Sequence, residues 1–189
     1  PGIRKVAQQT GRKDFFTFGE GFGIDKAGET HHMRKIESYV RDPKGAPVMQ
    51  GMLNFPLYGS VGDVMARGRP TQELAARIQN TLKLHSDPHR MLSFIDNHDV
   101  DRFLKGANEV ALRQSLALIM TLPGIPTLYY GTEQGFKEQR AAMFAKGYAS
   151  GGVDHFNPQS PLYTYIKSLS TLRKQNKVFS RGVPTLLRD

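Results

Sequence analysis

The hydrophobic positions of the chain fall into four short runs that predict four β-strands. The runs lie near residues 15–19, 49–55, 91–96 and 127–130. Their cores are 37, 40 and 35 residues apart, counted from Phe15, Met52, Leu92 and Thr127. A near-constant spacing of this size is typical of a strand that is followed by a helix.

The segments between these runs carry apolar residues at helical spacing. Leu74, Ile78 and Leu82 recur at every fourth position of a helix that begins at Thr71. Further helices are predicted over residues 3–9, 29–40, 107–121 and 162–175, and Met33, Ile36 and Val40 lie on one side of the helix 29–40.

Alternating strands and helices predict an α/β protein with a parallel sheet, because parallel neighbours need crossover helices. The runs are short and apolar, as in strands that are buried on both faces. Two architectures fit this pattern, a doubly wound sheet and a (β/α)8 barrel. In both, functional residues follow the carboxyl ends of the strands.

The charge of the chain adds little to this picture. The 189 residues include 26 Lys plus Arg against 17 Asp plus Glu, a net charge of +9. The basic residues are scattered, so a solvated surface is favoured and we expect no nucleic-acid partner. The chain contains no cysteine, which excludes disulfides and a cysteine nucleophile.

One window, residues 114–132, lacks Asp, Glu, Lys and Arg. Pro123, Gly124 and Pro126 interrupt it, so it predicts a buried helix, a turn and a buried strand rather than a membrane span. We therefore expect no membrane partner. The sequence starts at Pro1 without a secretory leader, so its compartment is unknown from these residues.

Acidic and histidine side chains directly follow the predicted strands. Glu20 follows the first strand between two glycines, which leave its side chain unobstructed, and His98 and Asp99 follow the third. Two carboxylates on one rim suit glycoside chemistry, in which one is a protonated acid and the other stays ionised. The alternative is that such residues are caps and polar loop groups, and we favour this for Asp101 and Glu133.

Common nucleotide and metal motifs are not found. Ile24 stands where a G-x-G-x-x-G loop needs its last glycine. His85 and His89 are four residues apart, but Pro88 breaks the helix that would align them. Residues 96–101 lack the glycine and distal Glu of a calcium loop. We therefore expect no cofactor and no metal site in this chain.

Three segments resemble the α-amylase family, glycoside hydrolase family 13. Residues 94–99, Phe-Ile-Asp-Asn-His-Asp, resemble the family's F-x-x-N-H-D segment. Residues 18–20, Phe-Gly-Glu, resemble its general-acid segment at the end of the fifth barrel strand, and residues 124–133 are similar to its eighth-strand segment G-I-P-x-x-Y-Y-G-x-E. The segments occur in the family's order, and the resemblance covers nearly the whole chain.

The resemblance implies an α/β fold in which residues 1–189 are the second half (strands 5–8) of a (β/α)8 TIM barrel, truncated on the N-terminal side. It implies retaining cleavage of α-1,4-glucosidic bonds in starch-like α-glucans. Glu20 would be the general acid and base, and Asp99 would stabilise the transition state. His98 would bind hydroxyls of the sugar being cleaved, and Phe22 would contribute an apolar wall.

One family feature has no counterpart in this sequence. The family's nucleophile is an Asp in a G-x-R-x-D segment at the fourth strand, whereas Asp25 lies in a glycine-rich loop without a strand of its own. A retaining enzyme needs two carboxyl groups about 5 Å apart. We therefore expect the isolated chain to be inactive and to require the missing N-terminal half of the barrel as a partner. The family also makes calcium possible in the full-length parent, and it alone favours a secreted or periplasmic location.

Two other functions are kept as alternatives. The first is a non-catalytic carbohydrate-binding or interaction module derived from the same fold, and the second is a basic nucleic-acid-binding protein. The presence of both Glu20 and Asp99 favours the enzyme, because a binding module needs no strong acid at this rim. Four parallel strands in an open arc also leave two unpaired edges, which predict self-association.

Overall fold

The computed structural model describes residues 2–12 and 14–187, and it alternates strands with helices. The strands are β1 (Phe18–Gly19), β2 (Gly51–Met52), β3 (Leu92–Ser93) and β4 (Ile125–Pro126). The helices are α1 (Gly2–Gln9), α2 (His31–Val40), α3 (Phe55–Val61), α4 (Thr71–Leu84), α5 (Phe103–Gly106), α6 (Glu109–Thr121), α7 (Pro161–Gln175) and α8 (Val178–Arg181). A π-helical turn, Gly62–Ala66, continues α3.

The four strands lie in chain order and run parallel. β1 pairs with β2, and β3 pairs with β4. A parallel bridge between Leu53 and Leu92 joins the two pairs, and the Asn54 amide donates to the Leu92 carbonyl at 2.9 Å. Because all four strands run the same way, their carboxyl ends share one edge, where the candidate residues lie.

The sequence predicts the position of three strands and misplaces the fourth. β4 precedes the predicted run 127–130, although the Thr127 amide still donates to the Ser93 carbonyl at 2.8 Å. Beyond this bond the chain turns away, so the aromatic pair Tyr129–Tyr130 lies past the strand rather than in it. The apolar run therefore marks the loop that follows the strand.

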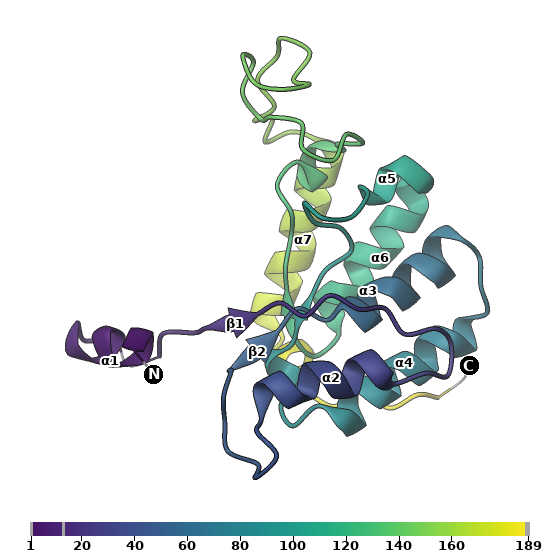
Figure 1. Cartoon of the computed structure of the whole chain (residues 1–189). Coiled ribbons are helices and arrows are strands. Elements are labelled where there is room, and N and C mark those ends of the chain that lie inside the picture. Colours follow the sequence, from purple (N-terminus) through teal and green to yellow (C-terminus); the bar gives the residue numbers. More distant parts are fainter. Residues whose placement is uncertain (1, 13, 188–189) are drawn as a thin grey trace.

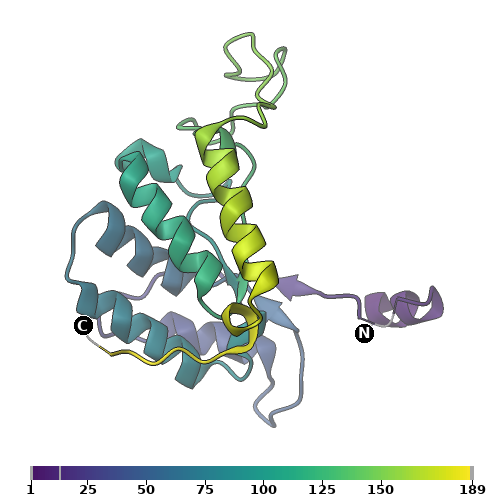
Figure 2. The ribbon, with the colours of Figure 1, turned by 180° about the vertical axis from the view of Figure 1, so that it is seen from behind.

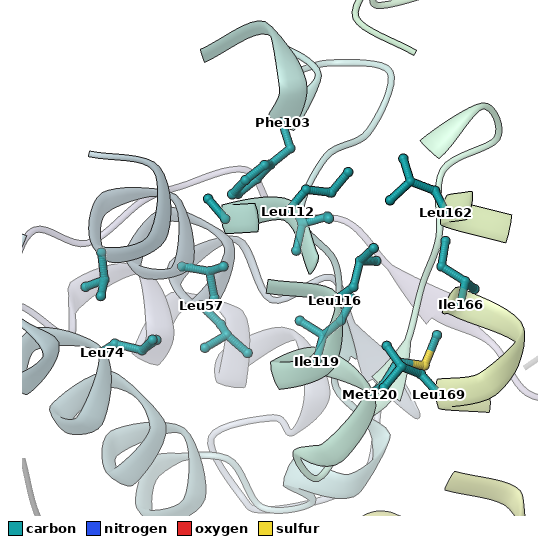
Figure 3. Packing of buried hydrophobic residues seen from close by; sticks show 14 residues of the cluster. Leu57, Leu74, Phe103, Leu112, Leu116, Ile119, Met120, Leu162, Ile166 and Leu169 are labelled. Carbon is teal, nitrogen blue, oxygen red and sulfur yellow. The ribbon is translucent and has the colours of Figure 1, made fainter. Parts of the chain in front are cut away.

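The helices pack against one another through one large apolar cluster, and a smaller cluster packs α2 on β2. Figure 3 shows side chains of α3, α6 and α7 pointing toward one another, with Leu57, Leu116 and Ile166 among them. Helices α6 and α7 lie side by side (Figure 2). The predicted face of α2 is confirmed, because Met33, Ile36 and Val40 are its buried residues.

Two parts stand away from this body. α1 lies beyond β1, with Ile3 and Val6 exposed, and the segment between Gly135 and Ser160 projects beyond the start of α7 (Figure 1). Within the described residues, no helix is long and apolar enough to cross a membrane.

A close backbone approach fixes the middle of the strand arc. Gly51 of β2 lies against the carbonyl oxygen of Arg90, and a Cβ atom at this position would overlap that oxygen. Glycine is therefore required here by space rather than by conformation.

Candidate functional site

Glu20 follows β1 directly and is exposed at the carboxyl edge of the strands. Phe22 comes two residues later, and its ring lies 4.7 Å from the ring of Phe55, the first residue of α3. Phe22 is 57% exposed, so most of its ring remains free to contact a ligand. The two side chains form the β1 part of the candidate site.

The loop that carries Glu20 and Phe22 is anchored by a buried ion pair. Asp25 Oδ2 lies 3.4 Å from Nη1 of Arg77, and both side chains are almost fully buried. The same carboxylate accepts hydrogen bonds from the backbone amides of His32 at 2.8 Å and Met33 at 3.0 Å. These amides belong to the first turn of α2, where a negative charge is favoured. Asp25 therefore caps a helix and holds a loop.

His98 and Asp99 form a contact within the loop after β3. The Nε2 atom of His98 lies 3.2 Å from Oδ2 of Asp99, and Nη2 of Arg140 lies 3.4 Å from Oδ1. The His98 carbonyl accepts from Nε2 of Gln139 at 3.0 Å and from Nε of Arg140 at 3.2 Å. The Asp99 amide donates to the side chain of Asn97 at 2.8 Å. The His98–Asp99 pair is thus exposed to solvent, and contacts with Asn97, Gln139 and Arg140 fix its position.

A buried carboxylate supports the same loop from beneath. Asp96 is 3% exposed, and it accepts from the Phe103 amide at 3.2 Å and from the Thr132 hydroxyl at 3.1 Å. Burial raises the pKa of Asp96, against the opposing effects of these hydrogen bonds and of Arg102. Asp96 connects the start of the β3 loop with its end and with the loop after β4.

Arg102 is the charged residue of this region that sequence reasoning missed. It is 1% exposed, and its guanidinium carbon lies 4.0 Å from the centre of the Tyr129 ring. Burial and the neighbouring Tyr130 raise the pKa of Tyr129 to about 12. The only sequence signal was the position of Arg102 at the end of a polar run, which does not distinguish a buried arginine from an exposed one.

The remaining polar residues of the edge have structural contacts. Asn54 is buried and caps α3, because its side chain accepts the Leu57 amide at 3.1 Å. Asp101 forms an exposed ion pair with Lys105 at 2.8 Å. These contacts agree with a loop role for Asp101.

The strand order brings Glu20 and the His98–Asp99 pair to one edge, with β2 between them. Neighbouring strands lie about 4.8 Å apart, so the two groups start from backbones separated by roughly 10 Å. No hydrogen bond or ion pair joins Glu20 to Asp99 among the described residues. Within residues 2–12 and 14–187, no group of three His, Asp or Glu side chains could hold a metal ion.

Known proteins are similar to this chain in sequence and in fold, although no protein-family model matches the chain. A cyclomaltodextrin glucanotransferase of Thermoanaerobacterium thermosulfurigenes is 33% identical over 170 residues, which are 88% of this chain and 22% of that protein. An α-amylase of Niallia circulans is 32% identical over 178 residues, which are 90% of this chain and 30% of that protein.

Solved structures give the same result. The cyclomaltodextrin glucanotransferase CldA matches with a TM-score of 0.72 and 26% identity, over 94% of this chain and 34% of its own. An α-amylase from Geobacillus thermoleovorans, solved with acarbose, matches with a TM-score of 0.69 and 25% identity, over 94% of this chain and 38% of its own. The chain therefore spans 22–38% of the length of these four relatives.

Proposed function

Because the chain is homologous to a segment of the α-amylase family of glycoside hydrolases, we propose that it supplies part of a catalytic site that acts on α-1,4-linked glucans. One observation carries this proposal. Glu20 and the His98–Asp99 pair follow parallel strands at one edge, and the family-like segments contain these same residues. The strand order also supports assigning β1–β4 to the second half of a (β/α)8 barrel.

The proposed chemistry divides the roles between the two carboxyl groups. Glu20 protonates the glycosidic oxygen as its bond to the anomeric carbon breaks, and then accepts a proton from the attacking water or sugar hydroxyl. Asp99 remains ionised and stabilises the positive charge that develops on the sugar ring. Its contacts with His98 and Arg140 support this role, because they hold both oxygens of the carboxylate in place.

The sugar is bound by the groups around these carboxylates. His98 is exposed and directed at Asp99, so its ring can share sugar hydroxyls with that carboxylate. Phe22 offers an exposed ring face next to Glu20, and sugar rings pack well on such faces. These two residues are proposed as the substrate-binding groups.

We further propose that the 189-residue chain alone does not turn over substrate. The covalent intermediate of a retaining enzyme requires a second carboxyl group about 5 Å from the acid. Asp25 cannot serve, because its oxygens are occupied by Arg77 and by two helix amides. Glu20 is also exposed, whereas a catalytic acid is usually surrounded by apolar walls or like charge.

The partner that completes the site is proposed to be the remainder of a barrel. Among the described residues, β1 pairs only with β2, so its other side is an open edge. An apolar groove between α1, β1 and the segment before β2 is lined by Ile3, Phe16, Phe18 and Met49. An unpaired parallel edge and an apolar groove are suited to the addition of further strand–helix units.

The test is a reducing-sugar assay with the purified 189-residue chain and maltoheptaose. The proposal expects no turnover above buffer, together with saturable binding of maltoheptaose in calorimetry. Turnover that disappears in Glu20→Gln would overturn the inactivity of the isolated chain, while supporting the role of Glu20. If neither turnover nor binding is observed, the assignment of the site to α-glucans is wrong.

A non-catalytic carbohydrate-binding or interaction module remains the second candidate, since the contacts of His98 and Asp99 would serve binding alone. The two functions differ in the full-length parent. An enzyme loses turnover in Glu20→Gln while its glucan affinity is retained, whereas a binding module shows no turnover in either form.

A further inference from the structure

Arg102 occupies an unusual position for a charged side chain. It ends the loop after β3, immediately before α5, and it is 1% exposed. Its Nε donates to the Glu138 carbonyl at 3.3 Å, and its Nη1 donates to the Thr132 hydroxyl at 3.4 Å. Its Nη2 is buried without a hydrogen-bond partner among the described residues. No carboxylate lies within ion-pair distance of Arg102 in the described part of the chain.

The buried carboxylate of Asp96 faces this cation across the shared Thr132 hydroxyl, and three aromatic rings surround the guanidinium. The guanidinium carbon lies 4.0 Å from the centre of the Tyr129 ring, 5.2 Å from that of Tyr130 and 5.7 Å from that of Phe136. All three distances are within the range in which a cation is attracted to a ring face. The nearest ring, Tyr129, is therefore held in place by the guanidinium.

The Tyr129 ring connects this buried cation with the candidate site. Its neighbours also include the imidazole of His98, at a centroid distance of 6.3 Å, and His98 in turn contacts Asp99. A chain of direct contacts thus runs from Arg102 through Tyr129 to the His98–Asp99 pair.

A second route through the backbone reaches the same pair. Arg102 binds the Glu138 carbonyl, and the next two residues, Gln139 and Arg140, both donate to the His98 carbonyl. Arg140 also reaches the Asp99 carboxylate. By binding the Glu138 carbonyl, Arg102 fixes the start of the segment 138–140, whose last two side chains donate hydrogen bonds to the His98 carbonyl.

We propose that Arg102 is a positioning residue of the candidate site, which orients the His98–Asp99 pair through the Tyr129 ring and the Glu138 carbonyl. The function that this orientation serves rests on the proposed glucan site. Arg102 does not touch the ligand, since it lies beneath the rings and is closed off from solvent.

The chemistry of the side chain argues against simple filling of space. A buried charge costs free energy, and an apolar residue of similar volume fills a core as well or better. A guanidinium is planar and presents its donors as a fork, so it can lie on a ring and donate to two oxygens in the same plane. Lysine and methionine can each reproduce only part of this arrangement.

The experiment compares Arg102→Met with a matched control in the 189-residue chain. Arg113 also lies over a tyrosine ring, at 4.8 Å from the centre of Tyr165, but on the outer helices α6 and α7. NMR follows the chemical shifts of the His98 ring and the cross-peaks between His98 and Tyr129, and calorimetry measures maltoheptaose affinity. Thermal unfolding shows that each variant is folded.

Arg102→Met is expected to change the chemical shifts of the His98 ring, to weaken the His98–Tyr129 cross-peaks and to lower maltoheptaose affinity about tenfold. Arg113→Met is expected to leave all three unchanged. Arg102→Lys keeps the charge but not the planar fork, and it should recover part of the affinity. If Arg102→Met does not fold, Tyr129→Leu carries the test, because removal of the linking ring should likewise change the His98 ring signals and lower maltoheptaose affinity.

The outcomes separate this proposal from the proposed function. A folded Arg102→Met with unchanged His98 signals overturns the positioning role, whether or not glucan binds. If the wild-type chain binds no maltoheptaose but His98 responds to Arg102→Met as expected, the positioning role stands and the glucan site is wrong.

Discussion

Asp25 and Arg77 form an ion pair of 3.4 Å in which the two side chains are 0% and 3% exposed. Arg77 also donates to the carbonyls of Asp25, Lys26 and Glu29, at 3.0, 2.9 and 2.8 Å. One buried arginine from α4 thus holds the loop that leads from Glu20 to α2. This contact explains how an exposed, glycine-rich segment keeps a defined position.

Removal of Asp25 is expected to be strongly destabilising. Asp25→Ala leaves the Arg77 guanidinium buried without its counter-ion, which costs about 3–5 kcal/mol in the free energy of unfolding. The control is Asp63→Ala, which breaks the more exposed Asp63–Arg67 pair and should cost less than about 1 kcal/mol. Urea denaturation measures both. Equal, small losses for the two variants would mean that the buried pair has no special role.

The free energy of unfolding should decrease as the pH is lowered below 6.5, the ordinary pKa of histidine. His85 is 4% exposed, and burial lowers its pKa from 6.5 despite the contact of its Nδ1 with Glu37 at 3.1 Å. The unfolded chain therefore takes up a proton first as the pH falls below 6.5. The loss continues, at up to about 1.4 kcal/mol per pH unit, until the folded histidine titrates as well.

Thermal unfolding between about pH 8 and pH 5 tests this dependence. His85→Gln should flatten the decline, whereas His31→Gln should not, because His31 is exposed at the start of α2. A decline of the same steepness in His85→Gln and in the wild-type chain would assign the pH dependence to other groups.

The close approach at Gly51 makes a further prediction. Gly51→Ala would push a methyl group into the Arg90 carbonyl and force β2 away from the segment before β3, at a cost of about 1–3 kcal/mol. Gly106→Ala is the control, because no atom lies within 4 Å of its Cβ position and it lies in α5. Chemical denaturation should show the loss only at Gly51. A tolerated Gly51→Ala would show that the strands can separate at this point without cost.

Helices whose formation depends on residues close in the sequence were predictable. Helices whose formation depends on contacts with distant residues were not. The apolar spacing of Met33, Ile36 and Val40 was sufficient to place α2 and its buried face. The segment 55–66 gave no helical signal, because Pro56, Gly59 and Gly62 are poor helix formers. It is helical because Asn54 caps it and because the core packs on it.

The candidate site divides in the same way. Glu20, His98 and Asp99 follow apolar runs and were identified as residues at strand ends, although their roles remain proposals. The buried partners Arg77 and Arg102 were not identified, because each is buried by segments that come from elsewhere in the chain. A sequence position does not tell whether a charged residue lies in solvent or inside the fold.

The most direct test of the central claim is an NMR titration of the 15N-labelled 189-residue chain with maltoheptaose. The largest shifts are expected at the amides of Glu20, His98, Asp99 and Tyr129. Asp99→Asn should weaken binding about tenfold or more, while the neighbouring exposed Asp101→Asn should leave affinity unchanged. Shifts that are absent, that are confined to the outer helices, or that persist with full affinity in Asp99→Asn would contradict the assignment of this edge as a glucan-binding catalytic site.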